Sequence, residues 1–257
     1  MFENKTVIIT GASSGIGAQT AKDIIKNGGK VIGVDIKAPD FEVAEFIQAD
    51  LSDKASIDRA IAALPEGASA LGNIAGLPPT QSANNILAVN LVGLKYFALG
   101  AIEKLAEGAS VVNLASLSGY NWRESLPLIK KAESLTFDGV VDFIRDNSMT
   151  AESTYPFTKE ALIVWTMQNR FRWQARGIRM NAVSPGPVKT PILDDFVQTM
   201  GKRVKDDMSI IGRAGEAEEI ASVVTFLLSS RSAWLKGSNI YVDGGMFANI
   251  LAEQYQF

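Results

Sequence analysis

Short apolar runs rich in β-branched residues alternate with longer stretches of helical periodicity along the chain. Each run is bounded by glycine or polar residues and has the length of a buried parallel strand. The runs predict strands at about 6–10, 30–35, 46–49, 70–74, 110–115, 179–183 and 239–242. The stretches between them predict helices at about 15–27, 53–63, 84–106, 154–176 and 216–230. Seven strands that alternate with helices are typical of an α/β protein with a doubly wound parallel sheet, covered by helices on both faces.

Two segments interrupt this regular pattern. Residues 187–211 are rich in Pro and Met and are predicted to be irregular. Residues 120–150 hold two short amphipathic patterns, at 123–135 and 137–144, so they are predicted to form a helical insertion rather than a bare loop. A solvated surface excursion is the alternative. Because the chain shows no repeat, no low-complexity tract and no linker, a single domain over residues 1–257 is predicted.

The composition restricts the chemistry. The chain has no Cys and no His, and 25 basic against 28 acidic side chains give a net charge of −3. The missing residue types exclude disulfides, thiolate or imidazole metal sites and Ser-His-Asp catalysis, so no metal site is predicted. Mild acidity argues against a nucleic-acid partner, and the absence of a leader or a long apolar run argues against a membrane. A cytoplasmic protein is expected, whose catalyst would be Tyr, Lys, Ser, Asp, Glu or a bound cofactor.

A glycine-rich loop follows the first predicted strand and opens the first predicted helix. Glycines let the backbone approach a pyrophosphate closely, and a helix N-terminus offers free N–H groups and a partial positive charge. The position between strand and helix therefore predicts phosphate binding, with a purely structural turn as the alternative. The residues involved are Gly11, Ser13, Ser14, Gly15, Ile16 and Gly17.

Residues at other predicted strand ends complete a dinucleotide site on a Rossmann-type fold. Asp35 ends the second strand, where a carboxylate can bind ribose hydroxyls and repel a 2′-phosphate. NAD is therefore favoured over NADP, although Lys37 lies nearby and a turn role for Asp35 is the alternative. Asp50 and Leu51 are placed at the adenine, with helix capping as the alternative for Asp50. The end of the fourth strand adds Asn73, Ala75 and Gly76.

Tyr155 and Lys159 stand four positions apart on a predicted helix, so their side chains share one face. A nearby ammonium favours the phenolate and lowers the pKa of a tyrosine, which normally lies near 10. A tyrosine adjusted in this way can exchange a proton with an alcohol near neutral pH. Taken by itself, the spacing is much more typical of a solvated helix pair.

The pair belongs to a longer ordered series of residues. The series runs Thr10-Gly11, Gly15, Gly17, Asn73, Ala75-Gly76, Asn90, Ser116, Tyr155, Lys159, Asn181 and Ser184-Pro185-Gly186. In this series the chain resembles the short-chain dehydrogenase/reductase family over essentially its whole length.

The resemblance implies a role for each matching residue. Tyr155 would be the general acid/base, Lys159 would lower its pKa and bind the nicotinamide ribose, and Ser116 would hydrogen-bond the substrate oxygen. Asn90 would hold a water that relays protons to Lys159. Ser118 is the alternative to Ser116. The nicotinamide carboxamide would be held by Pro185, Gly186, Val188 and Thr190, although Thr190 has a turn role as its alternative.

The chain departs from the family pattern in three places. Ile74 stands where the family usually has Asn, and Pro156 follows Tyr155. Because proline is tolerated in the first turn of a helix, this helix is predicted to begin at about Thr154. The gap from Ser116 to Tyr155 is much longer than usual, and the insertion at 120–150 fills it.

The insertion is predicted to lie near the substrate mouth because its ends adjoin Ser116 and Tyr155. It would act as a lid over the pocket or as a spacer in assembly. The lengthened gap resembles a subset of the family, the coniferyl-alcohol dehydrogenases and the bacterial 3α-hydroxysteroid dehydrogenases, which implies an apolar ring-containing alcohol. A predicted apolar pocket agrees, formed by Trp122, Leu126, Pro187, Ile192, Leu193, Phe196, Val197 and Met200.

These observations predict an NAD-dependent oxidoreductase that interconverts a hydrophobic alcohol and its ketone or aldehyde. The alternative is a dinucleotide-binding sensor or structural subunit without catalysis, against which the intact Ser116, Tyr155 and Lys159 weigh. Aromatic residues on the helix predicted at 154–176, Trp165, Phe171 and Trp173, together with the habit of the family, predict a homodimer or homotetramer.

Overall fold

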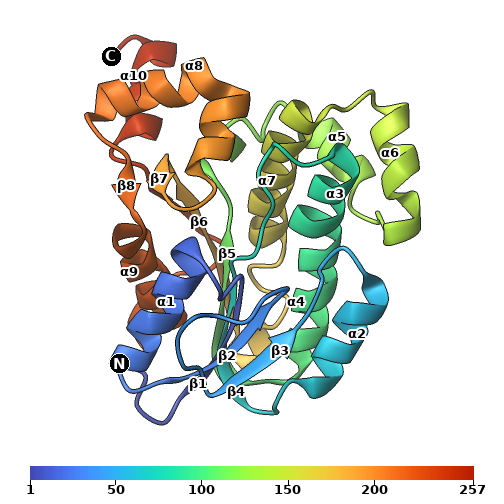
Figure 1. The fold of residues 1–257 in the computed structure, drawn as a ribbon, viewed down its shortest axis with the longest axis vertical. Coiled ribbons are helices and arrows are strands. Elements are labelled where there is room, and N and C mark those ends of the chain that lie inside the picture. Colours follow the sequence, from blue (N-terminus) through green and yellow to red (C-terminus); the bar gives the residue numbers. More distant parts are fainter.

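A seven-stranded parallel sheet forms the centre of the protein (Figure 1). The computed structural model describes the backbone of residues 1–257 and all side chains except those of Met200, Lys202, Arg203, Val204 and Asp207. The strand order is β3-β2-β1-β4-β5-β6-β9, and every neighbouring pair is parallel, which confirms the doubly wound sheet. The strands are β1 (Thr6–Thr10), β2 (Lys30–Asp35), β3 (Glu45–Gln48), β4 (Ala68–Asn73), β5 (Leu105–Leu114), β6 (Arg179–Pro185) and β9 (Asn239–Val242).

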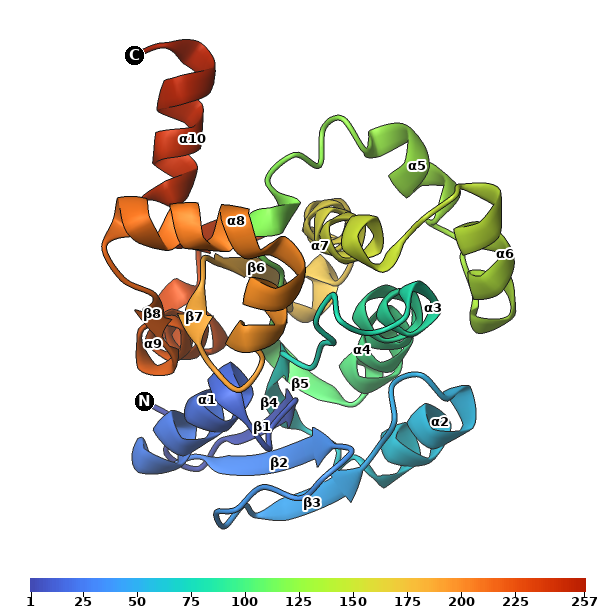
Figure 2. The ribbon, with the colours of Figure 1, turned by 45° about the horizontal axis from the view of Figure 1, so that its top comes forward.

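Alternate residues of the strands face two opposite layers of helices. In β1, Val7 and Ile9 belong to the same apolar cluster as residues of α1 (Gly15–Lys26) and α9 (Ala217–Leu228). Figure 2 shows these two helices on one side of the sheet. Ile8 joins the cluster formed on the other side by α2 (Lys54–Ala63), α4 (Leu94–Glu103) and α7 (Ala151–Gln168). Because both faces of the central strands are buried, these strands are mostly apolar, and this is the pattern that identified them in the sequence.

The long helix predicted at 84–106 consists of three segments. α3 (Ala83–Leu87) passes into a π-helical segment, Ala88–Gly93, before α4 begins. Asn90 lies in this π-helical segment, where such widened turns often serve a functional residue. Ala83–Glu103 is also the stretch of the described residues that has the length and apolarity of a membrane span, but 67% of its most apolar window is buried in the fold, as in a core helix.

The prediction that residues 187–211 are irregular is wrong. This region holds β7 (Val188–Lys189) and α8 (Leu193–Ile211), and β7 pairs with β8 (Gly215–Glu216). Asp194 and Asp195 place negative charge in the first turn of α8, and Gly212 ends the helix with a left-handed φ of 88°. These signals outweigh the nearby prolines. A further helix, α10 (Met246–Tyr255), was also not predicted, and it projects from the body of the protein (Figure 2).

The insertion forms the two short helices that the sequence predicts, α5 (Leu126–Lys131) and α6 (Val140–Asp146). Ile129 and Val140 are buried in one cluster with Leu87 of α3 and Phe157 of α7. The ring of Phe143 also stacks on Phe157, with centroids 5.8 Å apart. The insertion therefore covers the outer face of α3 and α7, which Figure 2 shows to the right of α7.

Two predicted helix starts are displaced by local hydrogen bonds. α7 begins at Ala151 rather than Thr154, because Thr150 and Ser153 form a capping box in which each side chain bonds the other residue's backbone. Pro156 therefore lies in the second turn of the helix. α2, predicted from about residue 53 with Ser52 as its N-cap, begins at Lys54, because Asp53 caps it and accepts hydrogen bonds from two backbone N–H groups.

A close approach at Gly93 yields a test of this packing. A Cβ atom at Gly93 would lie 1.9 Å from the carbonyl oxygen of Leu51, whereas a Cβ at Gly201 in α8 would meet nothing within 4 Å. Gly93→Ala should therefore lower the free energy of unfolding by about 1–3 kcal/mol. The control Gly201→Ala should raise it slightly, since alanine favours helices. Urea unfolding measures both, and a Gly93→Ala variant as stable as the parent would contradict the packing.

Candidate active site

The carboxyl ends of the central strands meet the N-terminus of α1 at one edge of the sheet. Ligands bind at this edge in doubly wound proteins, where the strand order reverses. Thr10 at the end of β1 joins it to β4, since its Oγ1 accepts hydrogen bonds from the N–H groups of Ile74 at 2.9 Å and Ala75 at 3.1 Å. This link was not predicted, although Thr10 directly precedes the glycine-rich loop.

The glycine-rich loop adopts a conformation that only glycine allows. Gly11 and Gly15 have φ values of 71° and 54°, in the left-handed region. A Cβ at Gly11 would lie 2.8 Å from the backbone nitrogen of Ala75, and one at Gly17 would lie 2.0 Å from the oxygen of Gly11. Ser14 precedes α1 without capping it by its side chain, so the first N–H groups of the helix remain open to an anion.

Asp35 lies where predicted, at the end of β2, but its carboxylate bonds the loop itself. Oδ2 accepts hydrogen bonds from the N–H of Ser13 at 3.0 Å and from its hydroxyl at 2.6 Å. Oδ1 accepts one from the N–H of Ile36 at 2.7 Å. Asp35 therefore holds the phosphate loop against β2, and Ser13 faces this carboxylate.

Asp50 and Leu51 follow β3 on the same edge. The exposed carboxylate of Asp50 accepts hydrogen bonds from the N–H and the hydroxyl of Ser52, both at 2.7 Å. Leu51 is buried, with its carbonyl against Gly93.

Buried amides link the ends of β4 and β5 to α7. Asn73 donates to the side-chain oxygen of Asn113 at 2.9 Å, and Asn113 donates to the hydroxyl of Thr166 at 2.9 Å. The Oδ1 atom of Asn73 is buried without a hydrogen-bond partner. The sequence argument missed Asn113, although this residue begins the run Asn-Leu-Ala-Ser that ends at Ser116.

Asn90 fixes the loop that follows β4. Its Nδ2 donates to the carbonyl of Leu77 at 2.9 Å, and its Oδ1 accepts from the N–H of Leu77 at 2.7 Å. A Cβ at Gly76 would lie 3.5 Å from Oδ1 of Asn90 and 3.6 Å from Nζ of Lys159. Gly76 therefore allows the amide of Asn90 and the ammonium of Lys159 to approach this turn from two sides.

Ser116, Tyr155 and Lys159 come together as the spacing predicts. Tyr155 and Lys159 lie one turn apart on α7, and the side chain of Tyr155 forms a hydrogen bond with Ser116. The hydroxyl of Ser116 also accepts from the N–H of Ser118 at 3.1 Å, which starts a short 3₁₀ turn. The Nζ of Lys159 donates to the carbonyl of Leu114 at 2.8 Å and lies 5.7 Å from the centroid of the Tyr155 ring.

Burial controls the protonation of this group. It raises the pKa of Tyr155 to about 12, while the hydrogen bond from Ser116 opposes that rise. It lowers the pKa of Lys159 to about 8. The predicted fall in the pKa of Tyr155 is therefore not observed, because desolvation of the phenol dominates and raises its pKa.

A cavity of about 130 Å³ opens on this group. Four of the residues predicted for an apolar pocket line it, Pro187, Ile192, Leu193 and Phe196. Trp122 and Leu126 do not, because Trp122 packs on Ala115 and Ile163 and Leu126 packs against α3 and α7. Val197 is also absent from the lining, and the side chain of Met200 lies outside the described residues.

The wall of the cavity is formed by α8 and not by the insertion. The ring of Phe196 meets that of Tyr155 edge to face, with centroids 5.0 Å apart. One residue earlier, Asp195 accepts a hydrogen bond from the hydroxyl of Thr80 at 2.8 Å. Among the described side chains, none from residues 120–150 lines the cavity, so the lining gives no support to the lid, one of the two roles expected for the insertion. The pocket residues Ile192, Leu193 and Phe196 were predicted, but the helix that carries Leu193 and Phe196 was not, because the segment was predicted to be irregular.

The predicted site residues divide into two groups along the sheet edge. The cavity is lined by Ile16, Gly76, Ser116, Ser118, Tyr155, Lys159, Pro185, Gly186, Val188 and Thr190. The remaining residues lie outside this lining, in the glycine-rich loop and at the ends of β2, β3 and β4: Gly11, Ser13, Ser14, Gly15, Gly17, Asp35, Asp50, Leu51, Asn73 and Ala75, with Asn90 behind Gly76. A Cβ at Gly15 would lie 3.3 Å from the side chain of Thr190, so the two groups adjoin.

Comparison with known proteins gives consistent matches. Residues 5–127 match the family described as short chain dehydrogenase, and residues 140–247 match the one described as enoyl-(acyl carrier protein) reductase. The chain is 41% identical to a coniferyl-alcohol dehydrogenase from a Pseudomonas species, over 95% of this chain and 96% of that one. It is 29% identical to 3-alpha-hydroxysteroid dehydrogenase/carbonyl reductase from Comamonas testosteroni, over 97% and 99% of the two chains.

A solved structure shares the whole fold. It is the 3-alpha-hydroxysteroid dehydrogenase from a Pseudomonas species in complex with NADH, which is 27% identical to this chain. The TM-score is 0.85, with 96% of this chain and 99% of that chain covered.

The lowered pKa of Lys159 predicts how the free energy of unfolding depends on pH. The pKa of Lys159 is about 8 in the fold against 10.5 in a free side chain, so the protonated form costs the fold about 3 kcal/mol below pH 8. Lys159→Met should therefore stabilise the ligand-free protein at pH 7. Between pH 8 and pH 10.5 the unfolded chain binds more protons than the folded one, so the parent becomes more stable as the pH rises. The difference in unfolding free energy between Lys159→Met and the parent therefore shrinks over this range.

Urea unfolding of the parent and of Lys159→Met at pH 7 and pH 10 measures this difference. Lys130→Met removes an exposed cation and should show no such dependence on pH. A stabilisation by Lys159→Met that stays constant between the two pH values would contradict a lowered pKa of Lys159.

Proposed function

Because the chain belongs to the short-chain dehydrogenase/reductase family, whose members here are oxidoreductases, we propose that it interconverts a neutral ring-containing alcohol and its carbonyl with NAD as coenzyme. One observation carries the proposal. Ser116, Tyr155 and Lys159 share a single apolar cavity, and that cavity adjoins the glycine-rich loop through Gly15 and Thr190. The proposed proton-transfer residues and the glycine-rich loop, which would bind the phosphates, thus lie next to each other along the carboxyl edge of the sheet.

The glycine cradle fits a dinucleotide. Any side chain at Gly11 or Gly17 would collide with backbone, and the N-terminus of α1 keeps its N–H groups open, as a pyrophosphate requires. In this proposal Asp35 binds the adenosine ribose, and Asp50 and Leu51 border the adenine. The nicotinamide half rests against Pro185, Gly186, Val188 and Thr190, with Asn73, Ala75 and Gly76 between the two halves. When bound, the coenzyme accepts or donates the hydride.

Tyr155 exchanges the proton in this mechanism. With a pKa of about 12 its phenol is neutral at pH 7 and can donate a proton to a carbonyl oxygen during reduction. For oxidation of the alcohol it must release that proton, which the hydrogen bond from Ser116 and the nearby ammonium of Lys159 favour. Ser116 also orients the substrate oxygen. Asn90 positions Gly76 and, in the family, a water on the path to Lys159.

The walls of the cavity support an apolar substrate. Ile192, Leu193 and Phe196 of α8 face the catalytic group, and Pro187 and Leu117 add further apolar surface. A volume of about 130 Å³ is well below the roughly 300–1,000 Å³ of ordinary ligand pockets. In this proposal the cavity widens when substrate and nicotinamide bind, by an outward movement of α8, which carries Leu193 and Phe196 of its wall.

The proposal includes a homodimer or homotetramer in the cytoplasm, without a nucleic-acid or membrane partner. The aromatic argument for association is weaker than the sequence suggested, because Trp165 and Trp173 are buried within the chain. Only Phe171 of the three is exposed. Association is therefore proposed from the family likeness alone, and light scattering over a range of concentrations tests it.

A substrate panel tests the proposed reaction. Aryl allylic alcohols, cyclic alcohols and hydroxysteroids are offered with NAD and with NADP, and short linear alcohols serve as controls. Reduction of NAD with ring alcohols at a higher kcat/KM than with the linear controls supports the proposal. Binding of NADH without turnover of any alcohol or carbonyl would favour a non-catalytic dinucleotide-binding protein.

Tyr155→Phe removes only the hydroxyl that exchanges the proton. It should lower kcat by at least about 100-fold while NADH still binds, as a fluorescence titration would show. Tyr255→Phe, at an exposed position on α10, serves as the control and should keep full activity. Activity of Tyr155→Phe within tenfold of the parent would remove Tyr155 from the mechanism.

Coenzyme choice depends on the charge at the end of β2. The parent should prefer NAD over NADP by at least about tenfold in kcat/KM, because Asp35 repels a 2′-phosphate. Asp35→Ala should narrow this ratio, and Lys37→Ala, which removes the neighbouring cation, should widen it. A parent enzyme that is faster with NADP would show that Lys37 outweighs Asp35.

A further inference from the structure

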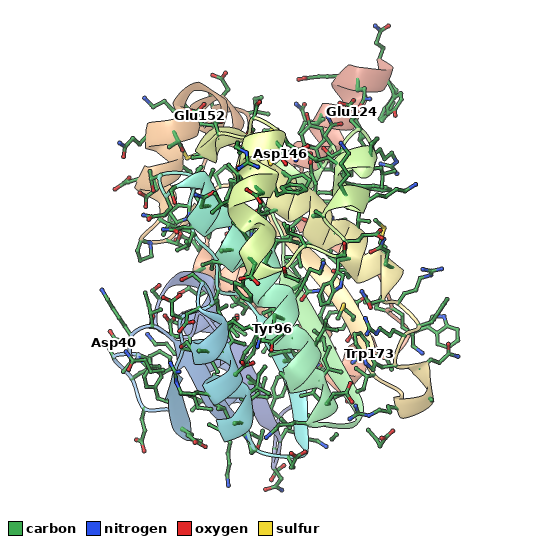
Figure 3. All side chains as sticks on the ribbon, turned by 90° about the vertical axis from the view of Figure 1, so that its right-hand side faces the viewer. Asp40, Tyr96, Glu124, Asp146, Glu152 and Trp173 are labelled. Carbon is green, nitrogen blue, oxygen red and sulfur yellow. The ribbon has the colours of Figure 1, made fainter. Side chains whose placement is uncertain are left out.

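A second hollow lies on the outer side of α7, away from the catalytic cavity. It is a groove of about 290 Å³ between α4 and α7, closed on one side by α5 of the insertion. It shares no lining residue with the catalytic cavity. Figure 3 shows the face on which it opens, where Tyr96 and Trp173 mark α4 and the segment after α7.

The floor of the groove is apolar and rigid. Leu91 and Ala161 are buried beneath it, and Trp165 is only 7% exposed. Ile129 of the insertion, 4% exposed, forms part of one wall. A flat apolar group would thus lie on side chains that the core already holds in place, so little ordering of the protein accompanies its binding.

The groove also holds a cation without a carboxylate partner. Lys95 donates to the backbone carbonyl of Glu133 at 3.1 Å, and no ion pair of Lys95 is found among the described side chains. The carboxylate of Glu133 instead accepts a hydrogen bond from Gln168 at 2.7 Å. Partial burial lowers the pKa of Lys95, although the charge of Glu133 opposes this fall. An ammonium has three donors, and one of the three is used here.

A second cation stands at the rim. The guanidinium of Arg172 lies 5.1 Å from the ring centroid of Trp173 and donates weakly to Asn169 at 3.4 Å. With Lys95 and Arg172 against the single carboxylate of Glu133, the groove carries a net positive charge.

We propose that this groove binds a small amphipathic carboxylate, with the anionic group at Lys95 and the apolar body along Trp165. The carboxylate supplies the charged acceptor that a half-buried ammonium lacks, and such charge-assisted bonds are about twice as strong as neutral ones. The volume is at the lower end of the roughly 300–1,000 Å³ of ligand pockets, which suits one ring with a short side chain.

Isothermal titration with 3-phenylpropionate tests the proposal, with 3-phenylpropionamide as the neutral probe of the same shape. The carboxylate should bind the parent protein at least tenfold more tightly than the amide. Lys95→Met, which keeps the apolar stem, should weaken the carboxylate at least tenfold and leave the amide unchanged. Lys130→Met is the matched control on α5, outside the groove, and should bind the carboxylate as the parent does.

Three results would overturn the proposal. Equal affinity for acid and amide would remove the role of charge, a result that needs no variant. Binding that is insensitive to Lys95→Met would place the carboxylate elsewhere, for instance beside Lys159 in the catalytic cavity. The third result has two parts: 3-phenylpropionate does not bind at millimolar concentration, and an amine-reactive reagent labels Lys95 slowly in a self-associated form of the protein. Together they would assign the groove to a second copy of the chain.

Discussion

The structure depends on keeping one ammonium group dry at the edge of the sheet. Lys159 is 4% exposed, and its Nζ donates a hydrogen bond to the backbone carbonyl of Leu114 at the end of β5. A buried charge with so little compensation is costly, and the same loss of solvent lowers the pKa of Lys159. Proteins retain such groups where chemistry needs a poised proton or a cation for an incoming ligand. The neighbouring features, from the turn at Gly76 to the bond between Ser116 and Tyr155, are arranged around this cation.

The two segments that interrupt the regular pattern, residues 120–150 and the region of α8, contribute to different parts of the molecule. α8 lines the reaction cavity and contacts both Tyr155, through Phe196, and the loop after β4, through Asp195. The insertion faces away from that cavity, and its helices bury Ile129 and Val140 against α3 and α7. The two ends of the insertion adjoin Ser116 and Tyr155, but its helices lie over α3 and α7, because their apolar side chains are buried there. The same packing creates the groove at Lys95.

The sequence was sufficient where a pattern is local or is imposed by burial. All seven strands follow from apolar runs, and the residues of the glycine-rich loop and of Tyr155-Pro156-Phe157-Thr158-Lys159 fall where their spacing requires. It failed where local signals compete or where depth of burial decides. The pocket role of Phe196 was predicted, but the helix that carries it was not, because nearby prolines masked its end signals. The start of α7 was misplaced because a capping box competes with the rule for Pro156. The protonation of Tyr155 depends on its depth of burial, which no spacing in the sequence reveals.

Transfer of a hydride from a carbinol carbon is the central claim, and an isotope-labelling measurement tests it most directly. The protein is incubated with NAD and an aryl allylic alcohol that carries deuterium at the carbinol carbon, and the mass of the reduced coenzyme is then determined. When deuterium replaces every hydrogen of the carbinol carbon, the account predicts reduced coenzyme heavier by one mass unit, and unlabelled coenzyme when the unlabelled alcohol is used. Formation of aldehyde with no deuterium in the coenzyme, or no reduced coenzyme with any ring alcohol of the panel, would contradict it.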